Sequence, residues 1–484
     1  MTKDNPPSTQ PGIGLMGLIA LVISSSIGSG VFALSSDVAK AASPGPALIA
    51  WAIVGIGFMA LANTFGRLSL ERPDLNGLID YAREGFGRFA GFISGWGYWL
   101  SIWIGAVAFG VMFITALSFF IPALQGPLGI PGVVIISIIN WFLIALVNHG
   151  VEEASIVNAI VMVCKLVPIF VFIVAMLFVF DGRVFTEDFW GTLHNNIAGS
   201  GAVGTGSVPA QISNCLMVMM WVFVGMEGAT VLGHRARDRR DVSRATVLGA
   251  TALVVIYVAA SILPYGFLPR EEIALIGAPS MPLIFSLVAG DVGGAFITAG
   301  LLVSILGAWL SYTMLASEAM LEMAQMELLP RSFAQLNVNG APTLSLIATG
   351  AMTQLLAILV MFSSEAYQFA YSLCTASIVV SWTLAAAYMA RYAHRNHARP
   401  GMRRAQVIAA IACVFLLVAI AVSGLHLLAL CCVAYVPGIY FYVRARRQYG
   451  DQTPLNRKEK AAAAVIVIAA AAALVLLALG LISI

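Results

Sequence analysis

Long apolar stretches separated by short polar segments run through this sequence from end to end. Each stretch reaches or nears the ~20 residues that an α-helix needs to cross the hydrocarbon core of a bilayer. The stretches recur at residues 13–35, 45–66, 88–119, 130–148, 154–180, 209–233, 245–268, 284–318, 342–362, 366–392, 405–423, 425–443 and 461–483. This pattern predicts an all-α membrane protein with about thirteen spanning helices.

Composition points to the same class of protein. The 484 residues are 60% hydrophobic and only 10% charged, and the mean hydropathy is +0.92, so these side chains cannot cover a water-soluble surface. The six cysteines fall inside apolar stretches, which indicates small buried residues and neither disulfides nor metal ligands. The first eleven residues are polar, and no cleavable signal peptide is expected.

Basic residues are distributed unevenly along the chain. If the spans alternate in direction, twenty-two of the 26 lysines and arginines fall on the side of the N-terminus. The other side keeps only Lys40, Arg183 and Arg270, and the remaining basic residue, Lys165, lies inside a span. The positive-inside rule therefore predicts a cytoplasmic N-terminus in the cell membrane. The basic segments are explained by topology and need no nucleic-acid partner.

The first span contains an unusual run of small residues, Ser24-Ser25-Ser26-Ile27-Gly28-Ser29-Gly30. Glycine and serine favour helix less than the residues around them, so a break at mid-membrane is expected here. Peptide groups freed by such a break are tolerated only where they line a cavity or bind a ligand. The N-terminus of the second half-helix suits a carboxylate. The alternative interpretation is close packing of neighbouring helices on small residues.

A second interruption, Gly225-Met226-Glu227-Gly228, lies in the sixth span, five spans after the first. Matching breaks in two halves of a transporter indicate an inverted repeat with a binding site at the membrane midplane. The predicted organisation is a cytoplasmic tail (1–12), a first repeat (13–180), a second repeat (209–393) and additional spans (403–484).

Two charged residues lie deep inside spans. Glu227 is an intramembrane acid, which suggests proton binding or a hydrogen bond that holds the unwound segment together. Lys165 lies about ten residues into the fifth span, some 15 Å from its end. Its ammonium group is expected to replace a sodium ion, to titrate during transport, or to form a static ion pair or helix-cap contact.

Aromatic residues cluster on the third, sixth and eighth spans and are candidates for gates or for contacts with a cationic ligand. Tyr98, Trp221 and Trp309 are the members of this set that we expect at a binding site. The sequence contains no Walker motif, metal-ligand spacing or nucleophile–base arrangement. We therefore expect no enzymatic activity and no cofactor.

Several short motifs accompany Gly28-Ser29-Gly30 and the Glu227 segment: PDLNG at 73–77, YAREGFG at 81–87, WGYW at 96–99 and LGAWLS at 306–311. With these residues the sequence resembles the amino acid-polyamine-organocation superfamily over almost its whole length. Within that superfamily it is most similar to the basic amino acid/polyamine antiporters of the arginine–ornithine exchanger type. The resemblance implies a LeuT-like fold with a 5+5 inverted repeat and discontinuous spans 1 and 6.

The resemblance also implies roles for individual residues. The substrate carboxylate would bind the amides of Ser29 and Gly30, and the α-amino group would bind carbonyls around Ser26, Trp221 and Val224. Tyr98, Trp221 and Trp309 would contact the side chain or act as gates. Glu227 would be the proton-sensitive acid, and Lys165 would replace sodium. We include Gly28 and Ser25 in the predicted site. Ser25 and Ala106 stand where the arginine–agmatine exchanger carries asparagines.

The predicted function is exchange of a cationic amino acid, arginine or lysine, for ornithine or a decarboxylated amine by alternating access. The alternatives are a proton-coupled amino acid symporter and a histidine/histamine exchanger. An ion channel is an alternative of a different class, and it would show no saturable counterflow. The expected partners are small-molecule substrates and lipid, and the expected assembly is a monomer or homodimer.

Overall fold

Helices make up almost all of the molecule. The computed structural model describes residues 13–75, 77–150, 155–191, 206–231, 236–363 and 365–479. Within these ranges there is no β-strand, and the only extended pairing is a single bridge between Ile13 and Ala236. Eleven helices are long and apolar enough to cross a membrane, and the bent pair α1 (Leu15–Ser26) and α2 (Gly30–Ala41) forms a twelfth span. The predicted all-α membrane class is confirmed.

The spanning helices follow the predicted apolar stretches in order. They are α3 (Pro44–Glu71), α5 (Arg88–Leu117), α6 (Ile130–Asn148), α7 (Ser155–Phe178), α12 (Arg239–Ile262), α14 (Ser280–Gln325), α15 (Thr343–Leu359), α16 (Ala366–Arg395), α17 (Met402–Ser423), α18 (Leu425–Gln448) and α19 (Arg457–Ala478). The remaining predicted span, 209–233, corresponds to the short helices α10 (Val208–Trp221) and α11 (Gly228–Val231). The predicted tail, 1–12, lies outside the described residues.

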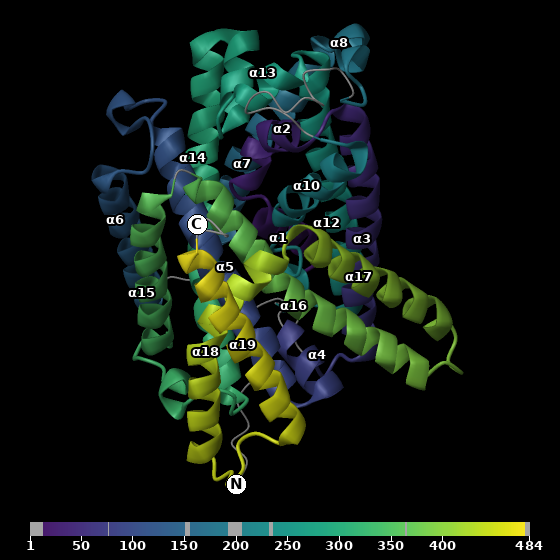
Figure 1. Cartoon of the computed structure of the whole chain (residues 1–484), viewed down its shortest axis with the longest axis vertical. Coiled ribbons are helices and arrows are strands. Elements are labelled where there is room, and N and C mark those ends of the chain that lie inside the picture. The colour runs from purple at the N-terminus through teal and green to yellow at the C-terminus, as the bar shows by residue number, and fades with distance from the viewer. Residues whose placement is uncertain are drawn as a thin grey trace.

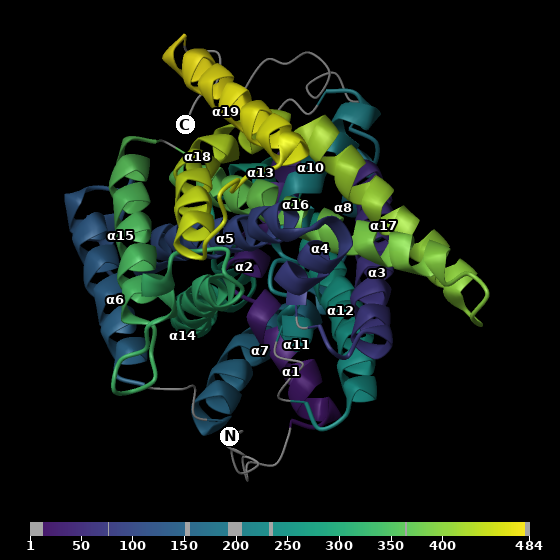
Figure 2. The same cartoon turned by 90° about the horizontal axis from the view of Figure 1, so that it is seen from below.

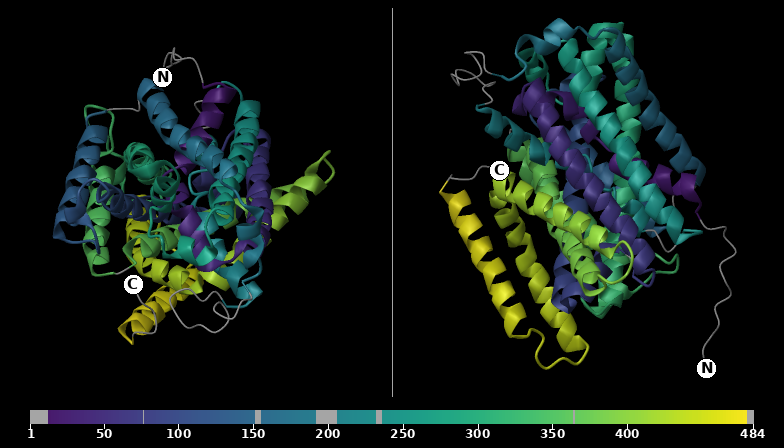
Figure 3. Two further views of the ribbon diagram at one scale, coloured as in Figure 1. Left: turned by 90° about the horizontal axis from the view of Figure 1, so that it is seen from above. Right: turned by 90° about the vertical axis from the view of Figure 1, so that its right-hand side faces the viewer.

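Burial separates a central helix from peripheral ones. The most apolar part of α5 is 89% buried, and α5 packs along α14 and α16. The corresponding part of α19 is only 17% buried, and α19 packs against α18 in a hairpin at the edge of the bundle (Figure 3). Helices α6 and α15 pair at another edge (Figures 1 and 2). The outer faces of these helices are apolar, as expected for contact with lipid.

The predicted eighth span, 284–318, differs from the observed helix. Gly290 interrupts α14 with a φ of 70° and a ψ of −176°, which lie outside the helical region. Glycine adopts this conformation without the steric cost that other residues would meet. Gly290 therefore divides α14 into two helical segments, 280–289 and 291–325.

The two ends of the bundle carry different short helices. The α13 end, at the top of Figure 1, contains α8 (Gly182–Glu187), α13 (Arg270–Leu275) and the end of α2. The α4 end contains α4 (Gly77–Phe86) and the final turns of α3 and α16. The start of α1 lies at the α4 end, where Arg237 N donates to Ile13 O at 3.0 Å.

Candidate functional site

The first span is broken where the small residues lie. Helix α1 ends at Ser26, α2 begins at Gly30, and the two helices are bent by 51° relative to each other. Ile27 is extended, with φ −78° and ψ 93°, and the residues from Ser24 to Gly30 are all buried. At the start of α2, Phe32 N donates to Ser29 O at 3.1 Å, whereas the amides of Ser29, Gly30 and Val31 donate to no backbone carbonyl among the described residues and are available to a ligand.

The sixth span is broken between Trp221 and Gly228. Tight turns replace the helical ladder here, with Val224 N donating to Trp221 O at 3.1 Å and Gly228 N donating to Gly225 O at 2.9 Å. Gly225 has a φ of 103°, and a Cβ atom there would lie 2.4 Å from the carbonyl oxygen of Ser25. Both the conformation and the close approach require glycine at this position.

Ser25 joins the two breaks. Its hydroxyl lies 2.7 Å from the carbonyl oxygen of Gly225 and 2.7 Å from that of Leu21, so it donates to either one. A Cβ atom on Gly228 would lie 2.8 Å from the same hydroxyl. This predicted substrate-binding residue therefore has partners within the protein.

Lys165 binds the end of α1. Its Nζ donates to the carbonyl oxygens of Ser24 at 2.9 Å and Ile27 at 3.1 Å, and the side chain is 1% exposed. A cation at the C-terminal end of a helix is stabilised by the unpaired carbonyls. The neighbouring carbonyl of Gly28 accepts from Ser304 Oγ on α14 at 3.2 Å.

Glycines on α14 allow α7 to bring Lys165 this close. A Cβ atom on Gly300 would lie 2.4 Å from Pro168 Cγ, and one on Gly307 would lie 2.3 Å from Val161 Cγ1. Both contacts are shorter than packing allows, so only glycine fits at these two points. The seven-residue spacing puts both glycines on one face of α14.

Glu227 organises the second break. Its carboxylate accepts from Trp382 Nε1 of α16 at 3.3 Å. The side chain is 1% exposed, and Tyr98 on α5 lies close enough to interact with its charge. This arrangement agrees with the hydrogen-bonding role considered for Glu227 and leaves the proton-binding role as a prediction.

Aromatic rings from four helices surround the start of α2. A Cβ atom on Gly30 would lie 2.8 Å from Trp221 Nε1, so the indole lies directly against this glycine. The Trp221 ring packs on Phe109 and Tyr371, each with a centroid distance of 6.0 Å. Phe109 packs in turn on Tyr312 at 4.8 Å.

The remaining predicted residues occupy different positions around this cluster. Gly28 lies directly against the Phe109 ring, because a Cβ atom at this position would be 2.6 Å from Phe109 Cε1. Ser26 O accepts from Gly28 N at 3.0 Å, and the buried Ser26 Oγ has no hydrogen-bond partner among the described residues. Trp309 is fully buried, and the end of its ring lies against Gly110 and not against Gly30.

Sequence reasoning missed several residues at this site. Phe109, Tyr371 and Trp382 lie in apolar helices, where an aromatic residue gives no signal beyond ordinary packing. Tyr312 lies on the eighth span, where aromatic residues cluster, but it is not among the residues expected at the site. The structure brings Tyr312 next to Phe109, one turn after Trp309.

Two hollows of ≈ 240 Å³ and ≈ 710 Å³ lie at the α13 end. Both are lined by Asp37, Lys40, Glu365 and Gln368, and the last three are exposed at the surface. The smaller hollow reaches Tyr367 and the larger reaches Tyr371. The larger hollow therefore extends from the surface to one ring of the aromatic cluster, Tyr371.

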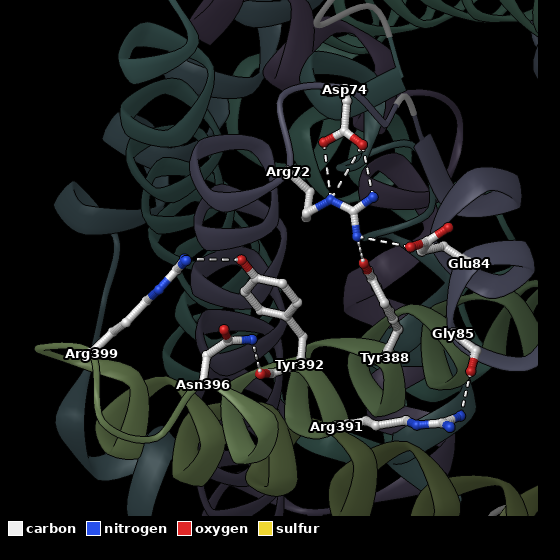
Figure 4. Close-up of polar contacts among 9 residues, drawn as sticks. All are labelled: Arg72, Asp74, Glu84, Gly85, Tyr388, Arg391, Tyr392, Asn396 and Arg399. Atoms are coloured by element: carbon white, nitrogen blue, oxygen red, sulfur yellow. Dashed lines mark hydrogen bonds and ion pairs between the residues drawn. The ribbon is translucent and has the colours of Figure 1, made fainter.

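A polar network joins the elements at the α4 end (Figure 4). Arg72 donates to both oxygens of Asp74, to Glu84 at 3.1 Å and to the Tyr388 hydroxyl at 2.5 Å. These hydrogen bonds from Arg72 hold the pKa of Asp74 below its usual range, so the carboxylate is ionised at neutral pH. Arg391 on α16 donates to the carbonyl of Gly85 at 2.5 Å. The network ties α3 and α4 to α16.

Interrupted helices that meet around buried peptide groups inside a membrane bundle are features of a secondary transporter. The chain belongs to the amino acid permease family, whose profile matches residues 13–429.

Three curated relatives indicate where the chain falls within the family. It is 48% identical to the arginine/ornithine antiporter of Latilactobacillus sakei, with 95% of both chains aligned. It is 40% identical to the arginine/ornithine antiporter ArcD1 of Lactococcus lactis subsp. cremoris, over 91% of this chain and 85% of the relative. It is 34% identical to the arginine/agmatine antiporter of Chlamydia felis, over 92% of each chain.

Proposed function

We propose that this protein is an antiporter that exchanges a cationic amino acid, arginine, for ornithine by alternating access. The observation that carries the proposal is the 48% identity, over 95% of both chains, to an arginine/ornithine antiporter. Relatives named for arginine/agmatine exchange are 34% identical, which favours ornithine as the counter-substrate.

The two breaks supply groups for an amino acid backbone. The amides of Ser29 and Gly30, at the positive end of α2, suit a carboxylate. Carbonyls around Ser26, Trp221 and Val224 would accept from an ammonium group. The aromatic cluster supplies faces that attract a cationic side chain by ~0.5–2 kcal/mol. We infer that residues 13–180 and 209–393 form the two repeats that share this site.

The direction of transport follows from a proposed orientation. We infer that the α4 end, which carries Arg72, Arg391 and Arg399, faces the cytoplasm, because positive charge favours that side. The hollows at the α13 end then open to the outside. Arginine would reach the site through them while the network at the α4 end stays closed.

A proton-coupled symporter is the second candidate. The observation that favours it is the pair of ionisable side chains, Glu227 and Lys165, each 1% exposed beside a helix break. Protonation of either group during transport would couple substrate movement to a proton gradient.

Counterflow in proteoliposomes separates the two functions. Labelled arginine is added outside vesicles that are empty or preloaded with ornithine, at equal pH and with an acid exterior. Exchange predicts uptake only into preloaded vesicles. Uptake into empty vesicles driven by the acid exterior would contradict the antiporter and support the symporter. Lysine, histidine, agmatine and histamine loaded in parallel identify the preferred counter-substrate.

A further inference from the structure

An apolar groove of ≈ 580 Å³ lies on the outer surface between α3 and α17. Its lining consists of glycine and apolar side chains, contributed by Ile53, Ile56 and Gly57 of α3, by Leu216 of α10 and by one face of α17. The side chains at its edges are well exposed, since Ile56 and Val414 are 64% and 59% exposed. Contiguous apolar surface of this kind marks contact with a protein or with lipid.

Gly57 shapes the floor of the groove. A Cβ atom there would lie 2.3 Å from Phe415 Cδ1, so the Phe415 ring fits directly against the backbone of α3. Phe415 is 8% exposed, and its ring packs on Phe58 at a centroid distance of 5.6 Å. Phe58 stacks in turn on Phe223, within the second break, at 4.2 Å. The groove is therefore built on the packed core of the bundle.

The groove is about as long as one leaflet of a bilayer is thick. Its α17 face extends from Val407 to Ala419, a distance of ~18 Å at the rise of an α-helix. One leaflet contributes about half of the ~30 Å hydrocarbon core. A single acyl chain lying along α17 would therefore be covered over most of its length.

Two arginines lie at the α4 end of the groove. Arg403 and Arg404 precede Val407 by four and three residues, so all three are neighbours on one face of α17. Both arginines are exposed, and neither forms a salt bridge with another described residue. The turn that carries them, between α16 and α17, projects from the bundle (Figures 1 and 2). Their guanidinium groups are therefore accessible from the membrane surface.

The end of α3 adds to this positive charge. Arg67 and Arg399 share a single carboxylate, that of Glu71, at 3.0 and 3.9 Å. Arg67 also lies next to the turn before α17, 3.4 Å from the point where a Cβ atom on Gly401 would be. The sequence contains no aspartate or glutamate within 366–450. The four arginines at this end of the groove thus have one carboxylate among them.

We propose that the groove between α3 and α17 binds an anionic phospholipid from the leaflet at the α4 end, with an acyl chain along α17 and the phosphate at Arg403 and Arg404. Guanidinium groups match the geometry of phosphate oxygens and can bind them in pairs. A second copy of this chain fits less well, because a two-fold interface in the membrane would bring the same arginines together at the same depth. Lipid binding of this kind does not depend on which substrate the protein carries.

The test compares two lipids whose headgroups differ in charge. Phosphatidylglycerol and phosphatidylcholine with identical acyl chains are titrated into the purified full-length protein in detergent, and the Kd of the first bound lipid is measured by native mass spectrometry. Arg403→Gln/Arg404→Gln removes the charge, and Arg403→Lys/Arg404→Lys keeps it. Arg457→Gln/Lys458→Gln is the matched control, because it removes two exposed positive charges at the start of α19.

We expect the wild-type protein to bind phosphatidylglycerol about thirtyfold more tightly than phosphatidylcholine, because each arginine near the membrane surface adds to the attraction. The glutamine variant should bind the two lipids within about twofold of each other, whereas the lysine variant and the α19 control should keep most of the preference. Equal affinity for both lipids in the wild type, or an unchanged preference in the glutamine variant, would overturn the proposal.

A second pair of variants tests the position of the acyl chain. Val414→Trp puts a large side chain into the groove, and Val465→Trp puts one on the outer face of α19, where the valine is 65% exposed. The first should weaken the binding of both lipids about tenfold, because apolar contact is lost, and the second should change neither Kd. If Val414→Trp leaves both Kd values unchanged but converts a dimer into a monomer in light scattering, the groove is an interface between copies and the proposal is wrong.

Discussion

Replacing Lys165 by methionine tests whether a fixed cation holds the broken first span in shape. Methionine has a similar length and fits an apolar helix, but it cannot donate to the carbonyls of Ser24 and Ile27, which Lys165 contacts at 2.9 and 3.1 Å. The carbonyls would remain buried, because methionine fills the same space and admits no water.

The expected loss of free energy in Lys165→Met follows from these two hydrogen bonds. Each buried carbonyl left without its partner costs ~1–3 kcal/mol, which gives roughly 2–6 kcal/mol for the two. The variant no longer has to bury an ammonium group, whose desolvation costs several kcal/mol and offsets part of that loss. We expect a net loss of about 2 kcal/mol, equivalent to roughly a thirtyfold weaker Kd if the site forms only with the intact α1 end.

The assay is substrate binding and counterflow with Lys165→Met, Lys165→Ala and the control Lys458→Met, which removes an exposed lysine at the start of α19. The alanine variant leaves room for a cation beside the freed carbonyls, so added sodium should restore part of its binding, whereas Lys165→Met should not respond. Wild-type affinity in Lys165→Met, with no sodium response in Lys165→Ala, would refute the reasoning.

Three further substitutions test other parts of the site. Gly30→Leu should abolish substrate binding, because its Cβ atom would lie 2.8 Å from Trp221 Nε1; a near-normal Kd would contradict the site assignment. Glu227→Gln keeps a hydrogen-bond acceptor but cannot ionise, so the pH profile of counterflow should flatten; an unchanged profile would remove this acid from proton coupling. Tyr388→Phe loses the 2.5 Å bond from Arg72 and should increase labelling of cysteines introduced at the α4 end, whereas labelling equal to wild type would exclude a closing role.

The sequence predicted the fold well because its strongest signals are local. Every predicted apolar stretch corresponds to a helix or a pair of helices, since membrane insertion demands a continuous apolar run. The break between Ser26 and Gly30 was also predictable, because small residues at mid-span disfavour helix there. The break in α14 at Gly290 was missed, since a single glycine is common in spanning helices.

The candidate site was less predictable because its contacts join distant parts of the chain. Ser25 bonds to the carbonyl of Gly225, 200 residues away, and no local pattern reveals that pairing. The eighth span illustrates the same difficulty. Trp309 and Tyr312 lie one turn apart, and only the packing of α5 shows that the Tyr312 ring lies 4.8 Å from the Phe109 ring whereas the Trp309 ring lies against Gly110.

The contrast between the two ends of the molecule indicates how alternating access could be balanced. The network at the α4 end consists of two ion pairs from Arg72 and two hydrogen bonds, from Arg72 to Tyr388 and from Arg391 to Gly85. The carboxylates of Asp74 and Glu84 are 59% and 48% exposed. Exposed ion pairs contribute ~0–1 kcal/mol each and hydrogen bonds ~1 kcal/mol each, so these polar contacts hold the α4 end closed by only a few kcal/mol.

Substrate binding can supply the free energy that is needed to open this network. Shifting a two-state equilibrium from 1:99 to 99:1 takes ~5.5 kcal/mol of differential binding, and a partial shift takes less. The contact between Lys165 and α1, in contrast, is fully buried and has to persist if the site is to keep its shape. We therefore expect the Arg72 network to break and re-form in each cycle, while the bonds from Lys165 to Ser24 stay intact.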